Sequence, residues 1–142
     1  MVITKGRVWA LLLIGILTGS ALGCASAGAS KAIGPNDLPS LAGKWIGTVM
    51  LPSGRSEPGT MDLSANGDYS VQTAGFTATG KAQVKDGSLT LVPTATSGGG
   101  GAMTGPRSSV ASLSERSDGA RVLTGSGHSA AGPFNFEVVR QK

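Results

Sequence analysis

The feature that most constrains this chain is a series of short segments in which apolar and polar residues alternate, separated by turn-forming residues. Alternation with a period of two is typical of strands that bury one face. Pairs such as Asn66-Gly67 and Asp86-Gly87 mark the turns, because these residues tolerate a positive φ. No sustained 3.6-residue period follows the N-terminal apolar run. The sequence therefore predicts an all-β fold of about eight short strands. The expected strands cover residues 44–51, 60–64, 69–73, 78–85, 89–91, 108–115, 121–124 and 133–140.

The short connections between these segments favour a small antiparallel up-and-down β-barrel. An open meander leaves an unpaired edge on its first and last strands, and closure into a barrel removes both edges. We therefore expect residues 44–51 to pair with residues 133–140. The Gly-rich stretch at residues 94–108 predicts no regular structure, because consecutive glycines hold a strand poorly. It is either a floppy hairpin loop or a lid or partner-contact loop at the barrel mouth.

The N-terminus has the parts of a secretory signal. Lys5 and Arg7 precede an apolar run at residues 8–17, which is shorter than the roughly 20 residues of a transmembrane helix. Small residues follow, and Cys24, the only cysteine of the chain, comes directly after Gly23. We therefore expect three parts: a signal peptide at 1–23 that is removed, a flexible tether at 24–40 and a β-barrel domain at 41–142.

This N-terminal pattern resembles the lipobox of bacterial lipoproteins, in which a diacylglycerol is attached to the cysteine sulfur and the signal is cleaved just before it. The resemblance implies a palmitate-bearing Cys24 and a lipid-anchored protein of the cell envelope. Ala25 stands where an Asp tends to retain Gram-negative lipoproteins at the inner membrane. The resemblance therefore favours the periplasmic face of the outer membrane if the host is Gram-negative. An ordinary signal peptide, cleaved at the Ala-Ser-Ala segment of residues 25–27, is the alternative.

Gly43, Lys44 and Trp45, at the head of the first expected strand, resemble the G-x-W signature of calycin barrels. That group includes lipocalins, avidins and periplasmic metalloprotease inhibitors. The resemblance implies a tryptophan packed at the closed end of the barrel and a late arginine lying across it. Trp45 and Arg140 are therefore the expected structural barrel-closure pair. Biotin binding is not implied, because biotin pockets in avidins use several tryptophans and Trp45 is the only one outside the expected signal.

The sequence contains no arrangement of residues typical of catalysis or metal binding. His128, the only histidine, lies in an expected loop at 125–129 without a neighbouring acid to orient it. Residues 75–81 match the phosphate-binding pattern G-x-x-x-x-G-K, but Ala82 replaces the hydroxyl residue that would bind Mg²⁺. The basic residues are scattered, which argues against a nucleic-acid partner. We therefore expect no enzyme, no catalytic residue, no cofactor and no metal site.

Two functions from different classes remain open, and the sequence leaves the oligomeric state open as well. The first is a binder of a small apolar or amphipathic ligand in the cell envelope. Its ligand-facing residues would be Val49, Leu51, Tyr69, Val71, Phe134 and Phe136. The second is a protein-contact module, such as a structural accessory or a hydrolase inhibitor of the envelope. It would present the loop around Arg55 or the Gly-rich loop at residues 97–107.

Overall fold

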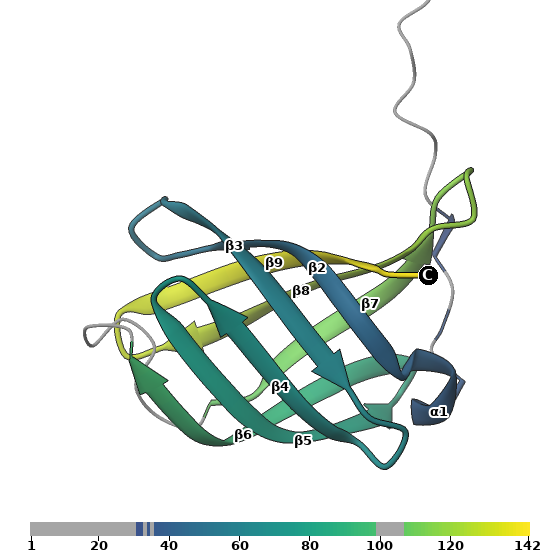
Figure 1. The fold of residues 1–142 in the computed structure, drawn as a ribbon, viewed down its shortest axis with the longest axis horizontal. Helices are drawn as coiled ribbons and strands as arrows, with labels where there is room; N and C mark the ends of the chain where they lie inside the picture. The colour runs from purple at the N-terminus through teal and green to yellow at the C-terminus, as the bar shows by residue number, and fades with distance from the viewer. Residues whose placement is uncertain (1–30, 33, 35, 99–106) are drawn as a thin grey trace, which may run out of the picture.

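The strands form a single closed antiparallel barrel (Figure 1). The computed structural model describes residues 31–32, 34, 36–98 and 107–142. Eight strands, β2 to β9, follow one another in chain order, and β9 returns to pair with β2. The predicted all-β, up-and-down barrel and the pairing of its first and last strands are therefore confirmed. The elements are β1 (Lys31–Ala32), α1 (Leu38–Leu41), β2 (Gly43–Met50), β3 (Ser56–Leu63), β4 (Asp68–Thr73), β5 (Phe76–Lys85), β6 (Ser88–Gly98), β7 (Ser109–Glu115), β8 (Arg121–Ser129) and β9 (Gly132–Arg140).

The expected turn residues make the tight hairpins. Lys85 pairs with Ser88, so that only Asp86 and Gly87 form the β5–β6 turn. Both turn residues have a positive φ, 51° and 72°, as a type I′ hairpin requires. The backbone twist of a type I′ turn matches the right-handed twist of the flanking strands. The Asp-Gly pair therefore fixes the register between β5 and β6.

Alternation divides each strand between the barrel interior and its outer face. On β3, the side chains of Met61 and Leu63 are buried and that of Asp62 between them is exposed. The buried residues form two clusters. The larger surrounds Trp45 near α1, and the smaller contains Val49, Leu51 and Phe76. These clusters mark two ends of the barrel, which we call the latch end (around α1) and the open end (around the β2–β3, β4–β5 and β8–β9 hairpins). In Figure 1 the latch end lies to the right, beside the C-terminus, and the open end lies to the left.

The expectation that residues 94–108 lack regular structure is wrong for residues 94–98. These residues complete β6, which pairs with β5 as far as Gly98 opposite Phe76. A bulge between Thr79 and Gly80 shifts the register, so that the strand continues beyond Pro93. β5 is long enough to pair with β6 along its whole length. The alternation of residues on β6 alone does not indicate this pairing. Residues 99–106 lie outside the described residues.

Strand β8 is longer than predicted, and His128 lies on this strand rather than in a loop. The expected strand ended at Thr124, because glycines at positions 125 and 127 are poor strand formers. In the structure, a Cβ on Gly127 would lie 2.6 Å from Cζ of Phe134. The phenylalanine ring on β9 therefore occupies the space that a side chain on β8 would need, and the glycine is required for this packing.

Strand β3 begins at Ser56, four residues before the predicted strand. Pro58 is unfavourable in a strand that has a neighbour on each side, because it cannot donate a backbone hydrogen bond. However, β3 pairs with β4 only from Gly59 onward, whereas β2 pairs along its whole length. Pro58 therefore lies where β3 has a neighbour on one side only, a place in which proline is tolerated.

Residues just before the barrel also take part in the fold. Lys31 and Ala32, which were assigned to the tether, form β1 and pair with Glu115 and Ser114 at the end of β7. The short helix α1 follows. Its N-cap is Asp37, whose side chain accepts a hydrogen bond from the backbone N–H of Ser40 at 2.7 Å. The helix thus starts at a defined residue and leads directly into β2.

Candidate functional site

At the latch end, the hydrogen bonds of Trp45 and Arg140 hold α1 across the barrel. Trp45 is fully buried, and its indole Nε1 donates to the carbonyl oxygen of Leu41 at 3.0 Å. Arg140 is the cross-strand partner of Trp45. Its guanidinium donates to the carbonyl oxygens of Ser40 at 2.9 Å and Ala42 at 2.5 Å. The carbonyls at the C-terminus of a helix lack partners within the helix, so these donors satisfy groups that would otherwise be unpaired.

Arg121 joins the same arrangement, although the sequence analysis did not single it out. Its guanidinium donates to the carbonyl oxygen of Ser40 at 3.1 Å, so that two arginines share one acceptor. The two arginines come from neighbouring strands, β8 and β9. Nothing in their sequence spacing indicated that they converge on α1. We assign the latch end to stability rather than to ligand binding, because its donors are used by the chain itself.

An apolar cavity of about 80 Å³ lies inside the barrel on the side of the open end. Five of the six expected ligand-facing residues line it: Val49, Tyr69, Val71, Phe134 and Phe136. The sixth, Leu51, is not part of the lining and instead packs with Val49 and Phe76 in the smaller core cluster. The inward faces of β2, β4 and β9 thus meet around one cavity.

Further lining residues were missed by the sequence analysis. Met61 and Leu91 lie on inward positions that the alternation had marked, and Val138 continues the inward face of β9. Phe76 was missed because the predicted strand began two residues later, at Ala78. Polar groups line the rim. Ser109 and Ser129 are buried, whereas Arg107 and His128 are exposed.

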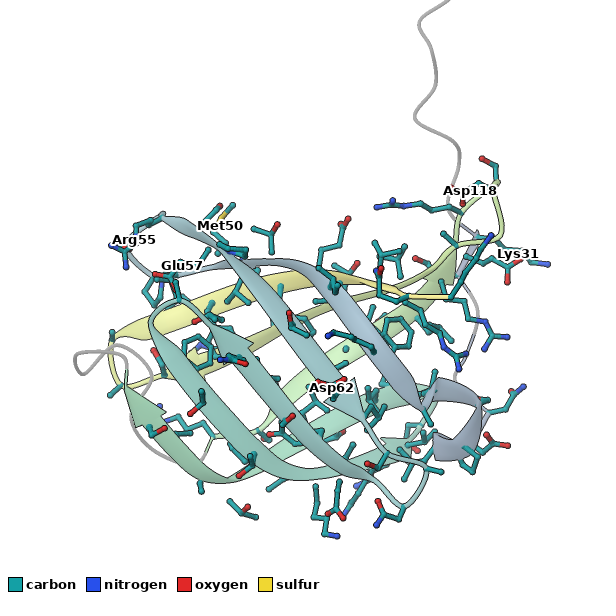
Figure 2. All side chains as sticks on the ribbon, viewed as in Figure 1. Lys31, Met50, Arg55, Glu57, Asp62 and Asp118 are labelled. Atoms are coloured by element: carbon teal, nitrogen blue, oxygen red, sulfur yellow. The ribbon has the colours of Figure 1, made fainter. Side chains whose placement is uncertain are left out.

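A buried carboxylate lies at the open end, on β3. The side chain of Glu57 is only 9% exposed, and its Oε1 accepts a hydrogen bond from the guanidinium of Arg55 at 2.6 Å. Among the described residues, none offers a hydrogen bond to the buried Oε2 of Glu57. Figure 2 shows Arg55 and Glu57 together beside the β2–β3 hairpin. The period of two from Met61 through Gly59 places Glu57 on the inner face, but the predicted strand stopped before it.

Two side chains have shifted pKa values. Burial raises the pKa of the Tyr69 hydroxyl to about 12, because the charged phenolate would lose its hydration inside the barrel. Asp68 lies on the outer surface, where hydrogen bonds from Lys81 and Asn66 lower the pKa of its carboxyl. The first shift reports the burial of a side chain that lines the cavity, whereas the second belongs to a surface ion pair.

Cys24, the expected lipidation site, lies outside the described residues. Within the described ranges, no three His, Cys, Asp or Glu side chains come together as a set that could hold a metal ion. Among the same residues, no helix is long and apolar enough to cross a membrane.

The fold and the site together define a closed eight-stranded up-and-down β-barrel with an apolar cavity toward one end and a helix fixed across the other. This architecture is compatible with the calycin-like barrel that the G-x-W resemblance implied. Comparisons with protein-family models, with curated protein sequences and with solved structures find no match to this chain.

Proposed function

We propose that this protein is a membrane-anchored lipoprotein of the cell envelope whose barrel binds a small apolar or amphipathic ligand, without catalysing a reaction. The observation that carries the proposal is the apolar cavity, whose lining includes none of the latch residues Trp45, Arg121 and Arg140. Apolar pockets with a few polar groups at the rim are the usual form of small-molecule sites. Here aromatic and aliphatic side chains form the walls, and Ser109 and Ser129 lie at the rim.

The volume of the cavity limits the ligand. A dry cavity of about 150 Å³ in another protein accommodates benzene, and the cavity here is about 80 Å³. An eight-stranded barrel leaves room for side chains or for one small ligand. The cavity therefore accommodates only the end of a narrow group such as an alkyl chain, and the rest of the chain and its polar part extend toward the open end.

The direct test is native against denaturing mass spectrometry of a chain that begins at Ala25, exposed to an extract of its own cells. This chain keeps every described element, since the first of them is β1 at Lys31. A discrete additional mass that is lost on denaturation is expected, and it identifies the class of ligand. A bare mass under native conditions contradicts the proposal.

A substitution inside the cavity sharpens the test. Ala78→Leu places a larger side chain on the cavity wall and should abolish ligand retention. Ala95→Leu is the matched control, because Ala95 is exposed on β6 and does not line the cavity. Equal retention by the two variants would show that the ligand is held elsewhere on the protein.

The membrane anchor is a separate part of the proposal, and it is supported by the sequence pattern around Cys24. Removal of residues 1–23 would leave Cys24 as the first residue, carrying palmitate and further acyl chains. Each buried methylene contributes about 0.8 kcal/mol, so several chains anchor a protein where one chain binds only marginally. The proposed location is the periplasmic face of the outer membrane if the host is Gram-negative. Labelled palmitate should enter the wild-type protein and not Cys24→Ala, and equal labelling refutes the anchor.

The alternative function is a protein-contact module, and the β2–β3 hairpin is the observation in its favour. The hairpin projects from the barrel in Figure 1. Near its ends, the Arg55 side chain is 71% exposed and Met50 is 49% exposed, so that a charged and a large apolar side chain are both available to a partner. If the native mass is bare, capture of envelope proteins by the lipidated wild-type protein but not by Arg55→Ala would favour this function.

A further inference from the structure

Glu57 is an unusual residue for the inner wall of a small barrel. Glu57, Gly59, Met61 and Leu63 are the buried residues of β3, and the first of them carries a charge. An ionised carboxylate loses several kcal/mol of hydration when it is buried, unless partners replace the water. The position of Glu57 therefore calls for an account of what satisfies both of its oxygens.

Only one of the two oxygens has a partner among the residues that the structure describes. Oε1 accepts the hydrogen bond from Arg55, whose own side chain is largely in solvent. Oε2 is buried, and no described residue donates to it. The surroundings of Oε2 are tight, since a Cβ on Gly75 would lie 3.3 Å from it. One acceptor at the open end is thus buried and unsatisfied within the described structure.

Glu57 does not itself line the apolar cavity, but its neighbours on the barrel wall do. Gly59, the next inward residue of β3, lines the cavity, and so does Val49, the cross-strand partner of Glu57 on β2. Two residues along a strand span about 7 Å, which is a few bonds of an alkyl chain. A narrow ligand with its tail in the cavity would bring its polar head to Glu57.

We propose that Oε2 of Glu57 accepts a hydrogen bond from the head group of the ligand, and that the ligand is an amphiphile with an N–H or O–H donor at one end. This inference rests on the proposed binding function and specifies its ligand class. An ammonium or hydroxyl head satisfies the buried oxygen. A carboxylate head places a second negative charge beside the first without supplying a donor. The open end therefore selects the head group, and the apolar cavity selects the tail.

The experiment compares three probes with the same tail and different heads: decylamine, decanol and decanoate. Binding to the chain that begins at Ala25 is measured by isothermal titration calorimetry near neutral pH. Hydrogen bonds to charged groups are strong enough to change affinity by about tenfold or more. The wild-type protein should bind decylamine and decanol at least about tenfold more tightly than decanoate.

Two substitutions test the role of the carboxylate. Glu57→Gln keeps the shape and removes the charge, so the preference over decanoate should largely disappear. Glu137→Gln is the matched control, because Glu137 also pairs with an arginine, Arg116, but its side chain is 54% exposed on the outer face of β9. Arg55→Met is a second, independent variant. It removes the only cation that pairs with Glu57 within the described ranges, and it should increase the preference for decylamine.

The outcomes separate this inference from the proposed function. If no probe binds the wild-type protein, the binding function fails and this inference fails with it. If the three probes bind with equal affinity, or if Glu57→Gln and Arg55→Met both leave their ratio unchanged, only the role of Glu57 is refuted. If Glu57→Gln does not fold, Arg55→Met decides alone, because it leaves the carboxylate in place.

Discussion

Replacing Arg140 with alanine should destabilise the barrel far more than replacing an arginine on its surface. Arg140 lies at the end of β9, and its two hydrogen bonds fix the C-terminal turn of α1 over the buried Trp45. Arg140→Ala removes both bonds and the part of the side chain that packs at the latch end. The side-chain donors left to α1 among the described residues would then be the indole of Trp45 and the guanidinium of Arg121.

The expected magnitude follows from the fate of each acceptor. The carbonyl oxygen of Ser40 keeps Arg121 as a donor at 3.1 Å, so its loss is partial. The carbonyl oxygen of Ala42 loses the only side-chain donor found for it among the described residues. A hydrogen bond from a charged group contributes about 1.5 to 3 kcal/mol, so the total loss should be about 2 to 4 kcal/mol. In a domain of this size each kcal/mol corresponds to roughly 4–8 °C in Tm.

Thermal and urea unfolding followed by circular dichroism measure this loss. Arg116→Ala is the control, because Arg116 forms an exposed ion pair with Glu137 and such pairs contribute less than about 1 kcal/mol. Arg140→Ala should unfold well below both the wild type and Arg116→Ala. If the two variants lose the same stability, the latch does not hold the barrel closed and the assignment of this end to stability is wrong.

Two further predictions concern the barrel wall and the cavity. Gly47→Ala should cost at least about 2 kcal/mol in urea unfolding, because a Cβ there would overlap the backbone carbonyl oxygen of Glu137 on β9; Gly34→Ala, where a Cβ meets nothing within 4 Å, should be neutral. The single tyrosine, Tyr69, should titrate near pH 12 in the folded protein by ultraviolet difference spectroscopy, against 10.0 in an unfolded chain. Since the folded state holds this proton more tightly, its contribution to stability is complete below pH 10 and is lost as the pH rises toward 12; titration near pH 10 without unfolding would contradict its burial.

The fold could be predicted because local signals agreed along most of the chain. Alternation marked inward positions such as Met61 and Val138, and Asp86-Gly87 fixed a two-residue turn. Closure followed from a general argument, since an open meander leaves two unpaired edges. The predicted boundaries were wrong where the neighbouring strand determines how far a strand extends. Gly127 is an example, because the Phe134 ring on the next strand occupies the space that its side chain would need.

The candidate site was only partly visible in the sequence, for a different reason. The inward faces of β2, β4 and β9 identified the aromatic and aliphatic lining, because burial of apolar groups has a clear period. Glu57 was overlooked because a charged residue next to Pro58 is typical of a loop, and only the register with Val49 shows that it faces inward. Arg121 was overlooked because its acceptor, the carbonyl oxygen of Ser40, is a backbone atom with no signature in the sequence.

The separation of the two ends explains how a small barrel can retain costly features around its cavity. The bonds from Trp45, Arg121 and Arg140 lie at the latch end, where they satisfy carbonyl oxygens of the chain itself. The open end has the smaller cluster, the apolar cavity and a buried acceptor to which no described residue donates. The cavity and the acceptor each lower stability. Side chains that line a cavity make fewer packing contacts, and an acceptor without a donor lacks a hydrogen bond. The proposed amphiphile would pack its tail in the cavity and donate a hydrogen bond to Glu57. One ligand would thus supply both the missing packing and the missing donor.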